Sequence, residues 1–251
     1  MISRRQLLGL GLVLPLLGAW PTNDTDLEAI RGILRSGIQR DSGGAVSAVF
    51  GMDPAVVAEV LQRATREDAL PGGYAPTDLV SVAAAGVPAA GYQVLRRIVL
   101  EDARALIEEA ANAGNNLYVG SGYRSEAYQA DVFAAQVRRW GDEDTANRYS
   151  ARAGHSQHQL GTTIDVTDAF GAFRKSPAAD WLRDNAHRFG FVLPYTQASV
   201  PLTGYVDEPW HARWVGRMLA SALKAGGYQD WNSMDADDVV ALVRSDSALD
   251  G

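Results

Sequence analysis

The sequence predicts an α+β domain preceded by a helical N-terminal extension, and three observations support this fold class. Several segments carry apolar residues at helical spacing, and short apolar runs between them suit strands. The two kinds of segment do not alternate regularly, whereas a doubly wound parallel sheet would require regular alternation. The chain has 251 residues, of which 47% are hydrophobic, so it can bury a sizeable core.

Residues 1–20 have the organisation of a secretory signal peptide. Arg4 and Arg5 form a basic start, an apolar run follows over residues 7–17, and small residues precede position 20. The run is shorter than the roughly 20 residues that span a bilayer. The arginine pair also resembles a twin-arginine signal, and an uncleaved anchor is the remaining alternative. We therefore expect export to the periplasm, cell envelope or medium, with no membrane-spanning segment after cleavage.

Net charge and cysteine content exclude several classes of function. The net charge is −7, and it becomes −9 without residues 1–19, which hold two arginines and no acids. An acidic chain without clustered Lys and Arg is a poor match for nucleic acid. Without cysteine, disulfides are excluded and a metal site must use His and carboxylate ligands. Nothing in the sequence specifies an oligomer, so a monomer is the simpler expectation.

Residues 21–70 are predicted to be a helical extension without chemistry of its own. Apolar residues recur at helical spacing over 26–38 and 53–68. The Pro-Gly-Gly sequence that follows marks a boundary. The main domain is therefore expected over 71–228, and residues 229–251 are expected to form a tail with a short helix.

Within the main domain, helical and strand patterns are mixed. The first helix is amphipathic and ends before Gly114, and Ser125 is a candidate N-cap for the second. The expected helices cover 93–113, 125–140, 178–189 and 218–225, and the expected strands cover 117–119, 162–166 and 210–215.

Three separated motifs hold most of the side chains that could carry chemistry. They are SGYRS at 121–125, GHSQHQLGTTIDV at 154–166 and EPWH at 208–211. The chain has four histidines, and three lie in these motifs. Together the motifs offer the histidines, carboxylates and arginine that a metal-dependent hydrolase requires.

His158, Asp165 and His211 are candidate ligands for one metal ion. A glycine between the first two predicts a turn, after which Asp165 would point away from the core face formed by Ile164 and Val166. Three protein ligands leave one position open, which is typical of catalytic zinc sites. Spacing alone also fits the ordinary alternative, in which His and Asp near turns only form hydrogen bonds.

Glu208 is a candidate general base because it precedes His211 by three residues. Strict strand alternation would place these two side chains on opposite faces, but Pro209 interrupts regular strand pairing and can bring both to one cavity. A carboxylate beside a ligand histidine is placed to take a proton from water. The alternative is an exposed acid at a strand entry.

Other polar residues near the motifs each have two interpretations. Arg124 can offer two parallel hydrogen bonds to a carboxylate or an oxyanion, or it can be a surface arginine. Ser156 can contact substrate or cap a turn. We expect His155 not to be a ligand, because it precedes the turn with a different orientation. His187 lies on an amphipathic helical pattern and is expected to be structural.

Taken together, SGYRS followed by Gln129, GHSQHQLG followed by Asp165, and EPWHARWVG resemble the VanY-like zinc D-alanyl-D-alanine carboxypeptidases. The order and separations agree, and the resemblance covers about residues 70–225. It implies a small antiparallel sheet flanked by helices, with the metal in a cleft over the sheet. Hedgehog-type signalling domains share this fold.

The resemblance also implies roles for individual residues. Zinc would be bound by His158, Asp165 and His211, Glu208 would be the general base, Arg124 would stabilise the tetrahedral intermediate or hold substrate, and Gln129 and Ser156 would help to bind the peptide terminus. The sequence departs from the family pattern at Ala153, Gln157 and Thr162-Thr163, where proline, glutamate and an apolar-small pair are more usual. These departures leave every ligand in place and leave the substrate preference open.

The leading hypothesis is zinc-dependent removal of the terminal D-Ala from peptidoglycan stem peptides during cell-wall remodelling. L,D-carboxypeptidases and peptidoglycan endopeptidases share the same metal set and stay open as alternatives. A non-catalytic wall-binding module is a third possibility, against which the intact Glu208 argues. A non-haem iron oxygenase would normally use a close His-x-Asp pair, which the chain lacks.

Overall fold

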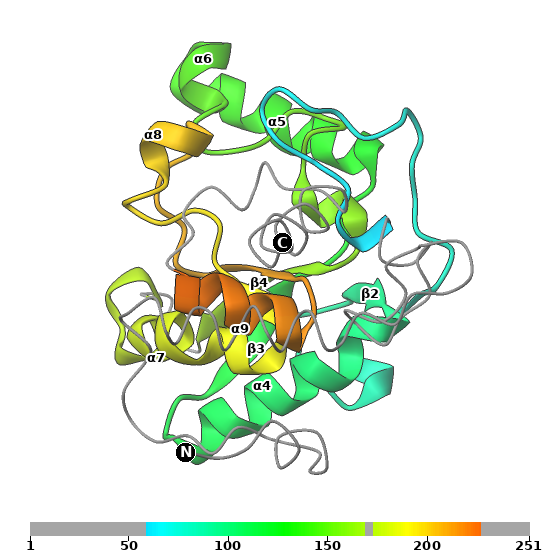
Figure 1. Cartoon of the computed structure of the whole chain (residues 1–251). Helices are drawn as coiled ribbons and strands as arrows, with labels where there is room; N and C mark the ends of the chain where they lie inside the picture. The colour runs from blue at the N-terminus through cyan, green and yellow to red at the C-terminus, as the bar shows by residue number, and fades with distance from the viewer. Residues whose placement is uncertain (1–58, 169–172, 227–251) are drawn as a thin grey trace, which may run out of the picture.

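The structure is a computed structural model that describes residues 59–168 and 173–226 (Figure 1). The fold is α+β, as predicted, with a four-stranded antiparallel sheet in the order β3-β4-β6-β5 and a separate two-stranded hairpin, β1-β2. The predicted signal peptide, most of the predicted extension and the predicted C-terminal helix lie outside the described residues. In the part of the chain that is described, no helix combines the length and apolarity needed to cross a membrane.

The elements follow each other irregularly along the chain. The strands are β1 (Leu79–Ser81), β2 (Val94–Arg96), β3 (Leu117–Ser121), β4 (Thr163–Asp168), β5 (Phe191–Val192) and β6 (His211–Trp214). The α-helices are α4 (Leu100–Asn112), α5 (Glu126–Trp140), α6 (Glu143–Ala146), α7 (Pro177–Asn185), α8 (Val200–Thr203) and α9 (Arg217–Gly226). Short 3₁₀ turns are η1 (Ala83–Ala85), η2 (Arg97–Val99), η3 (Gln157–Leu160), η4 (Phe173–Lys175) and η5 (Ala186–Phe189).

The four-stranded sheet has one apolar and one polar face. Ile164 and Val166 of β4 and Ala212 of β6 are buried in a core shared with α4, α7 and α9. This confirms the alternation predicted for the strand around Asp165. The polar face carries Asp165 and His211 and faces the layer that contains α5, α6 and α8 (Figure 1). The sheet therefore separates the hydrophobic core from the candidate site.

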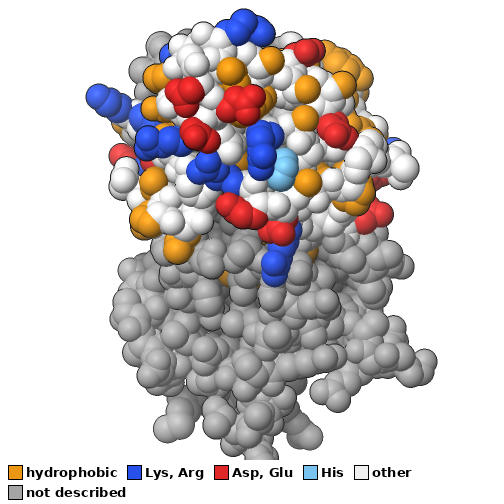
Figure 2. All heavy atoms as spheres, turned by 90° about the horizontal axis from the view of Figure 1, so that it is seen from above, with side chains coloured by type: hydrophobic (Ala, Val, Ile, Leu, Met, Phe, Trp, Pro, Cys, Tyr) orange, Lys and Arg blue, Asp and Glu red, His pale blue; other side chains and the backbone are white. Residues whose placement is uncertain are grey.

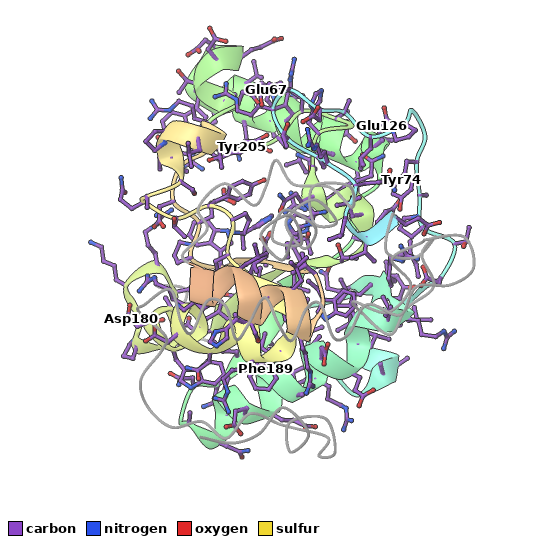
Figure 3. All side chains as sticks on the ribbon, in the orientation of Figure 1. Glu67, Tyr74, Glu126, Asp180, Phe189 and Tyr205 are labelled. Atoms are coloured by element: carbon purple, nitrogen blue, oxygen red, sulfur yellow. The ribbon has the colours of Figure 1, made fainter. Side chains whose placement is uncertain are left out.

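The layer above the polar face contains an aromatic contact and a capped helix. Tyr205 lies between α8 and the sheet (Figure 3), and its ring centroid is 4.8 Å from that of Tyr195. Ser125 accepts a hydrogen bond from the backbone N–H of Tyr128, which confirms it as the N-cap of α5. On the outer surface of this layer, charged side chains of both signs are interspersed (Figure 2).

The predicted helix over 93–113 is wrong in its first turns, because residues 94–96 form strand β2 and the α-helix begins at Leu100. Leu95 is fully buried opposite Val80 of β1. The backbone N–H of Arg96 donates to the carbonyl of Gly161 at 2.9 Å. Tertiary hydrogen bonds therefore override the helical periodicity of this segment.

The predicted helix over 53–68 also ends early, since only residues 59–60 of its described part are helical. Arg213 explains the break, because its guanidinium donates to the carbonyls of Val60 at 2.9 Å and Gln62 at 2.8 Å. Residues 59–70 therefore pack directly on the main domain. The predicted division at residue 70 stays a prediction.

Candidate active site

The three motifs meet on one row across the polar face of the sheet. Ser121 of β3 pairs with Asp165 of β4, which pairs in turn with His211 of β6. An irregularity between Val119 and Ser121 shifts the register of β3. A β-bulge of this kind re-aims side chains beside a site. The sheet thus brings residues up to 90 positions apart into one row, with Asp165 between Ser121 and His211.

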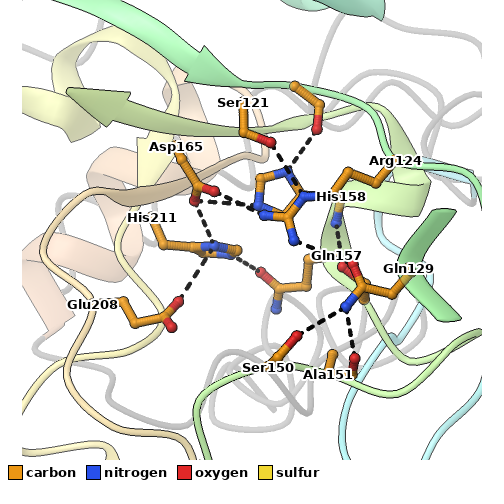
Figure 4. A network of polar contacts seen from close by, with 12 residues as sticks. Ser121, Arg124, Gln129, Ser150, Ala151, Gln157, His158, Asp165, Glu208 and His211 are labelled. Atoms are coloured by element: carbon orange, nitrogen blue, oxygen red, sulfur yellow. Dashed lines mark hydrogen bonds and ion pairs between the residues drawn. The ribbon is translucent and has the colours of Figure 1, made fainter. Parts of the chain in front are cut away.

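His158, Asp165 and His211 form a compact three-residue cluster that suits a metal ion (Figure 4). Asp165 Oδ1 lies 3.2 Å from His158 Nε2 and 3.2 Å from His211 Nδ1. Donor atoms bound to a tetrahedral zinc ion at about 2.0–2.1 Å lie about 3.3 Å apart, which the two distances from Asp165 match. The predicted ligand set is therefore assembled by the fold.

Each histidine is held by its other ring nitrogen. The His158 Nδ1 lies 2.6 Å from the carbonyl oxygen of Gly122, and the His211 Nε2 lies 3.0 Å from Gln157 Oε1. In a neutral imidazole, an N–H directed at these acceptors leaves the inward nitrogen with its lone pair. Contacts of this kind fix the orientation of metal-binding histidines.

Two glycines allow the chain to reach this geometry. A Cβ on Gly122 would meet the carbonyl oxygen of Val94 at 2.5 Å, so no larger residue fits where its carbonyl contacts His158. Gly161, which ends η3, has a φ of +69°. Only glycine adopts such a φ without strain. The turn predicted between His158 and Asp165 is confirmed.

Burial and neighbouring charges set the protonation of the cluster. Burial lowers the pKa of His158, with a further contribution from the Arg124 charge, and burial lowers the pKa of His211 to about 4. Burial alone would raise the pKa of Asp165, but contacts with His158, His211 and Arg124 hold it well below its ordinary value. Neutral histidines and an ionised aspartate are the states that bind metal.

Arg124 is fixed by three protein acceptors. Its Nη2 donates to Asp165 Oδ2 at 2.8 Å, its Nε donates to Ser121 Oγ at 3.2 Å, and its Nη1 donates to Gln129 Oε1 at 3.2 Å. The side chain is 18% exposed, and a guanidinium has five N–H donors, so donors remain for a further anion. The structure therefore gives Arg124 a structural contact to a candidate ligand besides the predicted contact with substrate.

The structure does not favour the expected substrate contacts of Gln129 and Ser156. Gln129 is fully buried, and its Nε2 donates to Ser150 Oγ at 3.1 Å and to the carbonyl of Ala151 at 2.6 Å. Ser156 is buried at the start of η3, where its Oγ accepts from the backbone N–H of His158. Gln129 therefore supports Arg124 by accepting its hydrogen bond, and Ser156 supports the turn that carries His158.

Glu208 faces the same cluster, because the chain turns between Glu208 and His211. The backbone N–H of His211 donates to the carbonyl of Glu208 at 3.1 Å, and the side-chain atoms Oε2 and Nδ1 are 3.7 Å apart. This turn, with Pro209 as its second residue, produces the departure from strand alternation that the sequence predicts. Burial, followed by the negative charge of Asp165, raises the pKa of Glu208 to about 8.

The other two histidines lie away from the cluster. His155 Nδ1 is 2.8 Å from the carbonyl of Thr65, and His187 is buried in η5. Sequence reasoning missed the contact from Gln157 and the aromatic support from Tyr195, whose ring centroid is 4.7 Å from that of His211. The departure from the family pattern at Gln157, beside His158, could have indicated the Gln157 contact. Tyr195 lies outside the motifs, so the sequence contained no indication of its contact with His211.

A family model named VanY, D-alanyl-D-alanine carboxypeptidase, matches residues 92–217. This match spans half of the chain and contains every residue of the candidate site. The chain belongs to the VanY family. Both the family resemblance and the fold predicted from the sequence are confirmed.

Individual relatives agree with this assignment. The chain is 31% identical over 179 residues to the putative carboxypeptidase YodJ of Bacillus subtilis (strain 168), covering 66% of this chain and 63% of YodJ. Less than two thirds of that relative is therefore matched. The LdcB LD-carboxypeptidase structure has a TM-score of 0.60 at 28% identity, covering 68% of this chain and 85% of LdcB.

A vancomycin-resistance D,D-pentapeptidase VanY, solved in complex with Zn(II), shares the fold. Its TM-score is 0.59 at 24% identity, and the match covers 67% of this chain and 95% of that chain.

Proposed function

We propose that this protein is a zinc-dependent carboxypeptidase that removes the terminal D-Ala from peptidoglycan stem peptides ending in D-Ala-D-Ala. The observation that carries the proposal is the partly buried Glu208 carboxyl beside the three-residue cluster, with its Oε2 3.7 Å from His211 Nδ1. A site that only bound metal would gain nothing from an acid in this position. Family membership and the Zn(II) complex of the related VanY fold support the choice of ion.

In the proposed mechanism, His158, Asp165 and His211 hold the ion. When bound, zinc acidifies water and polarises the scissile carbonyl. Glu208 ionises more readily once positive charge is added at the cluster, and its carboxylate then takes the proton from the attacking water. Glu208 later returns a proton to the leaving amine. The remaining N–H donors of Arg124 stabilise the developing oxyanion or hold the substrate carboxylate.

The two alternative cleavage specificities would use the same three metal ligands. The 28% identical LdcB is described as an LD-carboxypeptidase, so removal of D-Ala after an L-centre is the second candidate. An endopeptidase would cut inside the stem peptide instead. The sequence departs from the family pattern at Gln157, next to His158, and at Thr162-Thr163, just before Asp165. These departures leave the choice between the specificities open.

Defined muropeptides separate these activities. We expect the zinc-loaded full chain to shorten pentapeptide muropeptides by one alanine, with mass spectrometry identifying the product, and chelation to abolish the reaction. Shortening of tetrapeptides alone would identify an L,D-carboxypeptidase, and release of internal fragments an endopeptidase. Zinc-loaded protein that cleaves none of these substrates would favour a wall-binding module. Stoichiometric iron in protein purified without added metal would contradict zinc.

We also propose that the protein acts in the cell envelope after export, since its proposed substrate is there and residues 1–20 have signal-peptide organisation. Fractionation of the native host, followed by determination of the N-terminal residue, tests this. Recovery of uncleaved protein from the cytoplasm would contradict it.

A further inference from the structure

We propose that Gln157 is a positioning residue that selects the metal-binding tautomer of His211. This inference rests on the proposed zinc site. Gln157 Oε1 lies 3.0 Å from His211 Nε2, and the Gln157 side chain is almost completely buried (Figure 4). An acceptor at this nitrogen favours its protonation and leaves Nδ1, the nitrogen facing Asp165, free to bind an ion.

The surroundings of His211 make this selection necessary. Its Nδ1 lies 3.2 Å from Asp165 Oδ1 and 3.7 Å from Glu208 Oε2. Both carboxyl groups are potential acceptors, so they favour a proton on Nδ1, and a neutral ring has only one N–H to place. A proton on Nδ1 would occupy the lone pair that a metal ion needs. Gln157 is the contact that favours the opposite tautomer.

His158 provides the internal contrast. Its outer nitrogen, Nδ1, contacts the backbone carbonyl of Gly122 at 2.6 Å. A side-chain substitution cannot remove that acceptor, whereas the acceptor for His211 belongs to a side chain. Gln157 is therefore the point at which the tautomer of one ligand can be changed while the other ligand keeps its partner.

The short η3 turn explains how Gln157 reaches a residue 54 positions away. Ser156 caps this turn through the backbone N–H of His158, so Gln157 and His158 leave adjacent positions of one fixed turn. One turn thus supplies a ligand and the support of a second ligand. The Tyr195 ring packs against His211 on another side, with centroids 4.7 Å apart.

The experiment measures zinc affinity by chelator competition, and the His211 tautomer by ¹⁵N NMR of the metal-free full chain. In Gln157→Leu we expect about 10- to 100-fold weaker zinc binding and a shift of the ring proton toward Nδ1. Gln157→Glu keeps an acceptor, so we expect the wild-type tautomer and no loss of zinc affinity. Gln157→Asn, whose shorter side chain withdraws the acceptor, should weaken binding as well and covers the case in which the leucine variant does not fold.

Gln159→Leu is the matched control. Gln159 lies in the same turn and is fully buried, but its Nε2 donates to the carbonyl of Tyr74 at 2.9 Å. We expect this variant to keep wild-type zinc affinity. Equal losses in the Gln157→Leu and Gln159→Leu variants, or wild-type affinity and tautomer in Gln157→Leu or Gln157→Asn, would overturn the inference. A wild-type chain that binds no zinc would instead refute the proposed function, so the two failures are distinguishable.

Discussion

The two faces of the β4–β6 strand pair differ in chemistry, although the residues on them are direct neighbours in the sequence. Ile164 and Ala212 are fully buried among apolar side chains on one face, whereas their neighbours Asp165 and His211 meet with charged partners on the other. The apolar face gains stability from close packing of side chains, which does not depend on the positions of hydrogen-bond donors and acceptors. The polar face depends on defined hydrogen bonds, because an unpaired buried polar group is costly. Substitutions on the two faces should therefore change different measured quantities.

The largest expected effect is a loss of activity without loss of the metal. Glu208→Gln removes the proton acceptor but keeps the size of the side chain, so we expect kcat to fall by about 10²- to 10⁴-fold. Zinc content and the midpoint of thermal unfolding should stay at the wild-type values. Near wild-type turnover of stem peptide by this variant would remove Glu208 from the mechanism.

Arg124→Lys tests whether the polar face depends on geometry as well as on charge. Lysine keeps the positive charge, but its ammonium group cannot reproduce the planar contacts with Ser121, Gln129 and Asp165. We expect zinc affinity to fall by about 10-fold or more, measured by chelator competition, and kcat to fall as well. Arg104→Lys, on the exposed surface of α4, is the control. Unchanged zinc affinity in Arg124→Lys would show that charge alone suffices.

Ile164→Ala tests the apolar face. The side chain is fully buried, so its truncation should lower the free energy of unfolding by about 2–5 kcal/mol, measured by urea denaturation. We expect the folded variant to keep wild-type zinc affinity, because the cavity opens on the side of the sheet away from the ligands. A loss of zinc affinity as large as that of Arg124→Lys would show that the two faces are not separable.

The same division explains what the sequence could predict. Alternation along β4 depends only on neighbouring residues, so the placement of Ile164 and Asp165 followed from the local pattern. The ligand set followed from the motifs together with the family resemblance. The end of the helix after residue 60 did not, because it depends on Arg213, whose contact with Val60 joins residues 153 positions apart. For the same reason the burial of Gln129 was not predictable, since its amide group donates to Ser150 and Ala151, which lie 21 and 22 positions further along the chain.

His187 provides the smallest and most specific prediction, because it is a buried histidine outside the candidate metal site. Burial, with a smaller contribution from the charges of Lys224 and Arg188, lowers its pKa to about 4. The unfolded chain therefore binds this proton more readily than the folded one between pH 6.5 and 4. Above pH 6.5 His187 is neutral in both states and does not lower the free energy of unfolding. As the pH falls toward 4, its preference for protonation in the unfolded chain lowers the free energy of unfolding by about 1–3 kcal/mol in total.

Urea denaturation of the metal-free protein at pH 7.0 and pH 4.5 measures this decrease. In His187→Gln the loss of stability between the two pH values should be smaller than in the wild type by about 1–3 kcal/mol, because the titrating group is gone. Both proteins are compared without metal, so protonation of His158 and His211 contributes equally to each. Absolute stability can differ between them, since glutamine fills the site differently, and only the pH-dependent part is compared. An identical pH dependence in both proteins would show that His187 titrates alike in the folded and unfolded chain, and that burial alone does not set its protonation.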